Sequence, residues 1–450
     1  MQKINEKGSK IERLRKETEK LRRENGELKR ELKEFKKEFE EYKKRHPETA
    51  GVKHGKPYSF RASAESGRPK KLGARKGHKA HFRLKPKWAD EVRHLPVLRC
   101  PICGGTELSE EVQERGERIV EDIVIPKPLV TKIILDRRYC RHCKKLVESP
   151  VLIALPGARL GIRIMLVVVW LKIKLRLTEE AIPELLEKLF GIKISEGEVI
   201  NILAQVAGAF DPYHEQLIQE IRDAPARHID ETSWRIDGKN VWLWAFVTKG
   251  EALYKIASSR SHEVPLEVLG KGHNGVDIHD RFSAYKTRAR KTRNPQQECW
   301  AHLVNDAKEL AQFYGEEGEH IHQTIKKTYG CAKAFNHKGT DADIEKLFQS
   351  LADELNRPYK SHHCYKFVVN LLKEKDNLFE FVKNPEVDRT NNIAERYLRH
   401  SVIARKIGGG NRSTRGAIIY ERLLSIIHTL HVRDQDLLEY GPKILLTSDD

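Results

Sequence analysis

Three acidic residues occur where a strand or a helix end could point a carboxylate inward. Asp230 lies in ARHIDETSWRID near the start of a predicted strand, and period two places it on the same face as Trp234. Asp280 ends an apolar stretch in GVDIHDRFSAY. Glu395 lies in DRTNNIAERYLRH, inside a helix predicted to begin at Asp388 or at an Asn. A buried carboxylate is costly unless it is paired or binds a metal ion.

These acids together suggest phosphoryl-transfer chemistry. Mg²⁺ binds through a few carboxylates together with substrate phosphates, and Mn²⁺ favours the same oxygen ligands. Two such ions about 4 Å apart activate the attacking oxygen and stabilise the leaving one. We therefore predict that Asp230, Asp280 and Glu395, from two adjacent strands and a helix, are catalytic residues and ligands of two Mg²⁺ or Mn²⁺ ions.

Each acid also has a simpler explanation. Asp230 could cap a strand end, Asp280 could pair with Arg281, and Glu395 could pair with Arg399 four positions further on. Taken singly, these explanations are favoured. Taken together, in a basic chain with DNA-binding features, a metal site is the better interpretation.

Several neighbouring residues are expected to play supporting parts. Glu231, which alternates to the opposite face from Asp230, and Asp277 are either decoys without a catalytic part or supporting acids. His228 and His279, which lie beside the two aspartates, either orient water or DNA or are packing histidines. Trp300 and His302 could pack in the protein or contact DNA, and for Trp300 a core position is favoured.

Cations are concentrated in two regions that suit phosphate contacts. The interval 68–87 has nine Lys or Arg residues and no acid, which favours a basic arm that binds DNA or a solvated tether. A second group surrounds Glu395 and a Gly-rich stretch at 408–410 that allows close backbone approach. The DNA-binding candidates are Arg75, Lys76, Lys79, Arg83, Arg396, Arg399, Arg405, Lys406, Arg412 and Arg415.

Two Cys-x-x-Cys pairs predict a structural zinc site. The four candidate ligands are Cys100, Cys103, Cys140 and Cys143. Four thiolates make a closed tetrahedral Zn²⁺ site without an open position, so one structural ion is expected. The intervals 116–126 and 130–140 alternate like hairpin strands, which together with the cysteines indicates a zinc ribbon.

The first 47 residues predict a coiled coil. Apolar residues recur at both seams of a heptad pattern over residues 4–45, and Asn25 at a core position is typical of a two-stranded register. A homodimer or higher oligomer is expected, and a solvated single helix is the alternative.

The whole chain has 450 residues and a formal charge of +18, which favours a polyanionic partner, most often nucleic acid. Its most apolar run, at 164–174, is too short for a membrane span of about 20 residues. With no signal peptide pattern, we expect a cytoplasmic protein associated with the nucleoid and not with a membrane.

The predicted fold class is multidomain α+β. Within residues 153–223, two helices around a short turn at 191–195 suggest a helix-turn-helix, or an ordinary helical pair. The expected segments are a coiled coil (1–47), a basic arm (48–92), a zinc ribbon (93–152), a helical DNA-binding region (153–223), a first catalytic part of mixed strands and helices (224–304), a helical insertion (305–387) and a C-terminal catalytic helix with a basic tail (388–450).

The motifs HIDETSWRIDGKNVWLWAFVT, HDRFSAY, CWAHL and TNNIAERYLR with ARKIGGGNRSTRGA resemble the insertion-sequence sixty-six (TnpC-type) DDE transposases. The order of arm, ribbon and coiled coil is also similar. The resemblance implies a ribonuclease-H-like α/β core with a helical insertion, in which Asp230, Asp280 and Glu395 match the triad.

The resemblance implies a DNA transposase that cleaves transposon ends and joins their 3′-hydroxyls to target DNA. Its partners would be terminal inverted repeats and target DNA. The alternatives are a ribonuclease-H-like nuclease without strand transfer and an inactive or domesticated DNA-binding relative.

Overall fold

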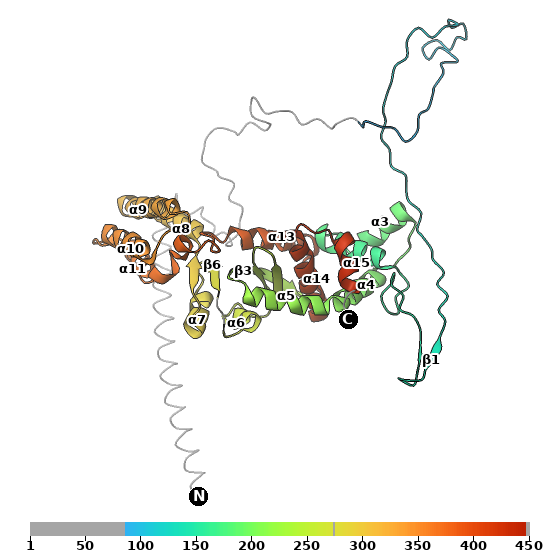
Figure 1. Cartoon of the computed structure of the whole chain (residues 1–450). Helices are drawn as coiled ribbons and strands as arrows, with labels where there is room; N and C mark the ends of the chain where they lie inside the picture. The colour runs from blue at the N-terminus through green and yellow to red at the C-terminus, as the bar shows by residue number, and fades with distance from the viewer. Residues whose placement is uncertain (1–85, 273–274, 447–450) are drawn as a thin grey trace. The chain divides into compact units, whose positions relative to one another are not determined.

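The computed structural model describes residues 86–272 and 275–446, in two units that divide at Glu121 and Asp122 (Figure 1). The predicted coiled coil, and the arm residues Arg75, Lys76, Lys79 and Arg83, lie outside the described residues. In the first unit, residues 86–121 contain turns and bends but no helix or strand. The predicted α+β class therefore rests on the second unit.

The region predicted as a zinc ribbon contains less regular structure than its sequence pattern indicates. Strand β1 (Arg138–Cys140) pairs antiparallel with β2 (Lys145–Val147) around the second cysteine pair. The predicted strand at 116–126 does not form, and only the end of the one at 130–140 does. Among the described residues the alternating apolar side chains of this segment are exposed; Ile123, for example, is 80% exposed. Alternation predicts a strand only where one face is buried.

A group of helices precedes the sheet. Helix α2 (Ile162–Val169) runs into a π-helical turn, η2 (Trp170–Lys174). It is followed by α3 (Ala181–Phe190), α4 (Glu196–Ala209) and α5 (Asp211–Asp223).

The turn between α3 and α4 is built as the sequence predicts. Gly191, at φ 68°, ends α3, and the Ser195 hydroxyl accepts the Glu198 N–H to begin α4. The first turn of α4 carries two carboxylates, Glu196 and Glu198, which do not favour phosphate contact. A DNA-reading role for this pair stays a prediction.

A five-stranded mixed sheet lies at the centre of the second unit, with strand order β5-β4-β3-β6-β7. Strands β3, β4 and β5 are antiparallel neighbours, whereas β6 and β7 run parallel to β3. The strands are β3 (Ala226–Ile236), β4 (Lys239–Val247), β5 (Ala252–Ala257), β6 (Val276–His279) and β7 (Gln296–Glu298). The two helices interleaved with them are α6 (Glu263–Leu269) and α7 (Ser283–Thr292).

Helices cover both faces of this sheet. Trp234 and Leu243 belong to a core shared with α2, α4 and α14 (Thr414–Val432). Ile229 and Trp244 belong to a second core shared with α5, α6 and α7. Successive residues of β3 and β4 thus enter opposite cores, which explains why β4 is apolar at every position from Val241 to Val247.

Helix α14 also covers the edge strand β5. The Thr429 and Ser425 hydroxyls accept the backbone N–H groups of Ala252 and Tyr254, and the Glu421 carboxylate accepts that of Ile256. These three side chains recur every four residues and meet every second N–H of the strand. The edge that could otherwise pair with another strand is therefore hydrogen-bonded within the chain.

A separate helical cluster lies between β7 and α13, as predicted for residues 305–387. It gathers around α8–α11 at one end of the unit, with its own apolar core that includes Ile321, Leu351 and Leu371 (Figure 1). Its helices are α8 (Trp300–Phe313), α9 (Gly315–Ala334), α10 (Asp341–Leu355), α11 (His362–Leu372), the short 3-10 turn η3 (Lys375–Asn377) and α12 (Glu380–Lys383).

Two further helices complete the unit. Helix α13 (Asn392–Gly408) carries Glu395 and packs against β3, and α15 (Leu437–Leu446) packs on α2. The predicted Gly-rich break lies between α13 and α14. There Gly410, at φ 110°, approaches β3 so closely that an added Cβ would lie 2.4 Å from the Arg235 carbonyl oxygen.

Candidate functional site

The fold positions the three predicted acids on adjacent elements. Asp230 lies four residues inside β3, not at its start as the sequence suggested, and its side chain is buried. Asp280 directly follows β6, and Glu395 lies in the first turn of α13. Since β3 and β6 are parallel with His228 opposite Ile278, the same register carried two residues further brings Asp280 alongside Asp230.

Electrostatics show that the acids share one site. Burial raises the pKa of Asp230 well above its usual value, and the nearby carboxylates of Glu231, Asp280 and Glu395 raise it further. Only the N–H of Glu231, at 2.9 Å, opposes this effect by donating to the Asp230 carboxylate. Such a site favours a bound cation.

The two ion pairs that would explain Asp280 and Glu395 more simply do not form. Arg281 pairs with Glu298 at 3.2 Å and with Asp306 at 3.4 Å, so it is not the partner of Asp280. Among residues 86–272 and 275–446, no Lys or Arg forms an ion pair with Asp230, Asp280 or Glu395. Within the same range, the ion-pair contact of Glu395 is with a histidine and not with Arg399. No lysine or arginine of the described residues therefore compensates the charge of these acids.

The three carboxylates do not all gather within 4.8 Å of one another. In this geometry a single ion does not reach all of them directly. A pair of ions about 4 Å apart spans a wider set of ligands. The donor set, oxygen atoms only, is the one that Mg²⁺ and Mn²⁺ favour.

The two supporting acids, in contrast, are fully paired. Glu231 accepts from Arg260 at 2.7 Å and from the Tyr285 hydroxyl. Asp277 is paired with Arg227 at 2.7 Å and with Arg288, all three side chains being buried. These are structural ion pairs inside the sheet layer, so they leave no oxygen set free for a catalytic metal.

The residue that connects Glu395 to the sheet was missed by sequence reasoning. Asn391 is fully buried just before α13, and its amide N–H donates to the Ile229 carbonyl at 2.8 Å, one residue from Asp230. Its Oδ1 lies 3.2 Å from His228, and its backbone N–H donates to the Cys299 Sγ at 3.1 Å. The only signal in the sequence is a pair of asparagines before a helix.

The neighbouring histidines and the tryptophan have structural partners. His228 lies between Asn391 and Asp388, at 3.2 and 3.1 Å, and His279 lies 2.9 Å from Gln296. Trp300 is fully buried, donates to the Leu378 carbonyl and stacks on an aromatic ring of α9. The interpretation of Trp300 as a core residue is confirmed.

Exposed cations follow Glu395 along α13 and the next loop. Arg396, Arg399, Lys406, Arg412 and Arg415 are all exposed, and within the described part of the chain none of them has an acidic partner. They can therefore neutralise phosphates beside the acids.

Arg405 differs from the other predicted DNA contacts. It donates to the backbone oxygen and hydroxyl of Ser233, and burial lowers its pKa. With the approach of Gly410 to Arg235, this contact anchors the end of α13 to β3. Arg405 and the glycines thus have a structural role in shaping the site.

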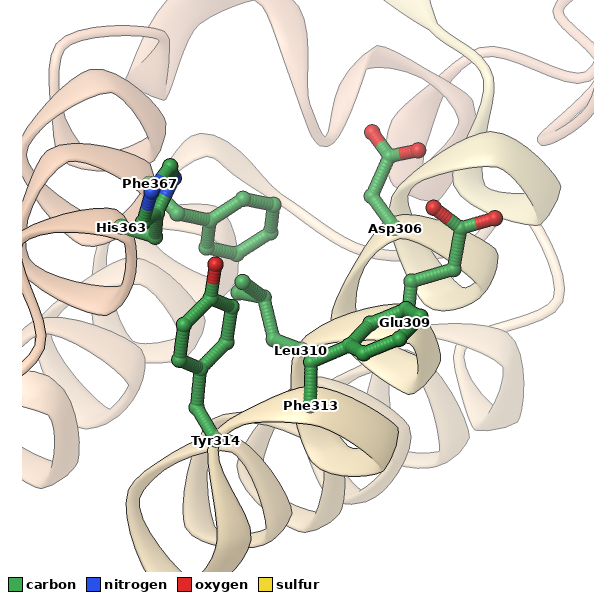
Figure 2. A pocket seen from close by; sticks show the side chains of 7 residues that line it. All are labelled: Asp306, Glu309, Leu310, Phe313, Tyr314, His363 and Phe367. Atoms are coloured by element: carbon green, nitrogen blue, oxygen red, sulfur yellow. The ribbon is translucent and has the colours of Figure 1, made fainter. Parts of the chain in front are cut away.

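Two cavities lie outside the acidic site. One of about 300 Å³ lies between α8 and α11, with Asp306 and Glu309 on one side and His363 and Phe367 on the other (Figure 2). A larger one of about 530 Å³ lies beside the glycines of the α13–α14 loop, and Trp234, Arg176 and Arg412 are among its lining residues. The three acids line neither of them.

Each cysteine pair forms a local turn suited to metal binding. Backbone N–H groups of Cys103 and Ile102 lower the pKa of Cys100, and the N–H of Cys143 is the largest cause that lowers the pKa of Cys140. The two pairs lie in different units of the chain. A shared four-cysteine Zn²⁺ site stays a prediction.

Comparison with known proteins identifies the class. The family described as Transposase IS66 family matches residues 157–418, more than half of the chain. The protein is therefore a nucleic-acid-processing enzyme of the transposase class. It belongs to the IS66 transposase family. No curated protein matched the chain.

Among the described residues, none of the helices is both long and apolar enough to cross a membrane.

Proposed function

We propose that this protein is a DDE transposase, which cleaves DNA at transposon ends and joins the ends to target DNA. The observation that carries the proposal is a group of three acids, Asp230, Asp280 and Glu395, that lie near one another and have no Lys or Arg partner in the described chain. The sheet order β5-β4-β3-β6-β7, with two parallel and two antiparallel neighbours, supports a ribonuclease-H-like core.

Asp230, Asp280 and Glu395 would bind two Mg²⁺ or Mn²⁺ ions. Bound ions would polarise the scissile phosphate and activate the attacking hydroxyl of water or of a DNA end. Arg396, Arg399 and the cations after α13 would bind flanking phosphates and so orient the DNA backbone at the acids. Asn391 and Arg405 would keep α13 and β3 in register during the reaction.

The proposal extends to the parts that precede the core. The coiled coil at 1–47 would bring two subunits to paired ends. The basic arm with Arg75, Lys76, Lys79 and Arg83, the zinc-binding cysteines and the helical region 153–223 would recognise the terminal repeats. The protein would act in the cytoplasm on nucleoid DNA.

The test is a joining assay with purified protein, Mg²⁺, DNA of the transposon end and a target plasmid. Joined products support the proposal, and cleavage without joining indicates a nuclease instead. Asp230→Asn should abolish both activities, whereas Asp341→Asn, at an exposed acid on the insertion, should leave them unchanged. Absence of both activities from the wild-type protein, with DNA binding retained, would indicate an inactive relative.

A further inference from the structure

A second set of metal-type ligands overlaps the acidic site. The Sγ of Cys299, a ring nitrogen of His302 and a carboxylate oxygen of Glu395 all lie within 4.8 Å of one another. In the part of the chain that the structure describes, this is the one group of three such residues that meets so closely. Glu395 therefore belongs to two ligand sets, one made of oxygens alone and one that adds sulfur and nitrogen.

The fold explains why the three residues meet. Cys299 precedes α8 and His302 lies in its first turn, three positions on, so both side chains lie on one side of the helix. The start of α8 is tied to the start of α13, because Trp300 N–H donates to the Arg389 carbonyl at 3.0 Å and Asn391 N–H donates to Cys299. Glu395, in the first turn of α13, is thereby held 3.6 Å from His302.

The surroundings of His302 suit a metal ion. Its side chain lies 3.6 Å from the Glu395 carboxylate and beside the Sγ of Cys299. Within the described residues, its Nδ1 is buried and has no hydrogen-bond partner. A buried nitrogen in anionic surroundings, beside a thiol and a carboxylate, is a ligand position for a metal ion.

The donor chemistry selects the kind of ion. Thiolate and imidazole ligands favour Zn²⁺ over Mg²⁺, and a site with three protein ligands leaves one coordination position open. Mg²⁺ instead favours carboxylates and water.

We propose that Cys299, His302 and Glu395 form a Zn²⁺ site that competes with the catalytic metal ions. On binding, the Cys299 thiol releases its proton to solvent and the thiolate coordinates the zinc. The Glu395 carboxylate then coordinates zinc and is no longer available to the two catalytic metal ions, so zinc inhibits the enzyme. Only this inhibition depends on the proposed function; the site itself does not.

The first test measures bound metal in the full-length protein. After equilibration with buffered free Zn²⁺, the wild type should hold one more zinc per chain than Cys299→Ser or His302→Gln. Cys364→Ser, a matched control at a buried cysteine of α11 outside the group, should equal the wild type. Each variant is compared after its folding is verified by circular dichroism. His302→Gln decides the outcome if the buried Cys299→Ser does not fold.

A cobalt titration shows which residue supplies the sulfur. With Co²⁺ as the probe, added to zinc-free protein, the thiolate-to-cobalt charge-transfer band should lose one equivalent in Cys299→Ser and none in Cys364→Ser. Equal zinc content and equal cobalt bands in wild type, Cys299→Ser and His302→Gln would overturn the site.

The second test measures inhibition. Zn²⁺ should inhibit Mg²⁺-dependent cleavage by the wild type. Cys299→Ser should need at least about tenfold more zinc for half-maximal inhibition, since loss of even a residue that hydrogen-bonds a metal ligand lowers metal affinity about tenfold. Each protein is compared with its own zinc-free rate. A zinc site without any DNA cleavage would contradict the proposed function alone, whereas cleavage with equal zinc sensitivity in both proteins would contradict the inhibition.

Discussion

At the scale of single residues, Asn391 decides how Glu395 meets the sheet. Asn391→Ala leaves the Ile229 carbonyl without its side-chain donor and His228 without a partner at Nδ1. Losing the partner of a buried polar group costs about 1–3 kcal/mol. We expect the unfolding free energy in urea to fall by that amount and DNA cleavage to fall more than in an equally destabilised variant.

The neighbouring Asn392 supplies the control for this prediction. Asn392 is exposed and begins α13. Asn392→Ala should change the unfolding free energy by less than about 0.5 kcal/mol. Equal effects of the two substitutions would show that Asn391 does not position the helix.

A buried histidine predicts how stability depends on pH. Burial lowers the pKa of His214 on α5 to about 4, and its Nε2 has no hydrogen-bond partner among the described residues. The unfolded chain, with a histidine pKa of about 6.5, then binds more protons than the folded one between about pH 6.5 and 4. Stability is therefore lost as the pH falls through this window, by up to about 2 kcal/mol at pH 5 from this residue. The slope of urea stability against pH should be smaller in His214→Gln.

At the scale of elements, the cover of β5 by α14 gives a separate prediction. Thr429→Val keeps the shape of the side chain but removes the acceptor for the Ala252 N–H. We expect a loss of about 1–3 kcal/mol in unfolding free energy. The change Thr414→Val, at the exposed first residue of α14, serves as the control. If both variants unfold at the same urea concentration, the hydroxyl contact does not stabilise the edge.

The elements show what the sequence could predict. The strands at 226–257 and the helices at 305–387 carry strong periodic patterns, and the structure has both. The sequence predicted Asp230 near the start of its strand, whereas β3 begins four residues earlier, where Arg227 and His228 are buried and paired. The prediction of a strand at 116–126 was wrong. Alternation of apolar and polar residues does not show whether a surface exists that could bury the apolar face.

The acidic site was likewise predictable from the sequence only in part. The residue types of Asp230, Asp280 and Glu395 suggested a shared site, and the parallel register of β3 and β6 brings the first two together. The contacts of Asn391, and the meeting of Cys299 and His302 with Glu395, were beyond prediction, since they join segments far apart in the chain. Pairing of Glu231 with Arg260 and Tyr285 is likewise visible only in three dimensions.

At the scale of the whole molecule, the positive charge should control DNA binding. Arg396 and Arg399 are exposed beside Glu395 and have no acidic partner in the described ranges. The double substitution to Gln should weaken binding to any DNA sequence and lower the salt slope of log affinity by about 2. Filter binding or anisotropy at several salt concentrations measures both quantities.

The matched control removes two exposed lysines from the insertion, Lys326 and Lys366. This pair keeps the change in net charge the same but lies on helices α9 and α11, away from the start of α13. We expect a smaller loss of affinity and a smaller change in salt slope. Equal losses of affinity in the two double variants would indicate that DNA affinity depends only on the net charge of the protein.

The helical insertion separates β7 from α13, so Glu395 is synthesised long after Asp230 and Asp280. During translation Asp230 and Asp280 therefore leave the ribosome before Glu395 has been synthesised. A prematurely terminated chain lacks the third acid. It also lacks α14, which covers one face of the sheet and the edge strand β5. If the proposed function holds, such a chain cannot cut DNA.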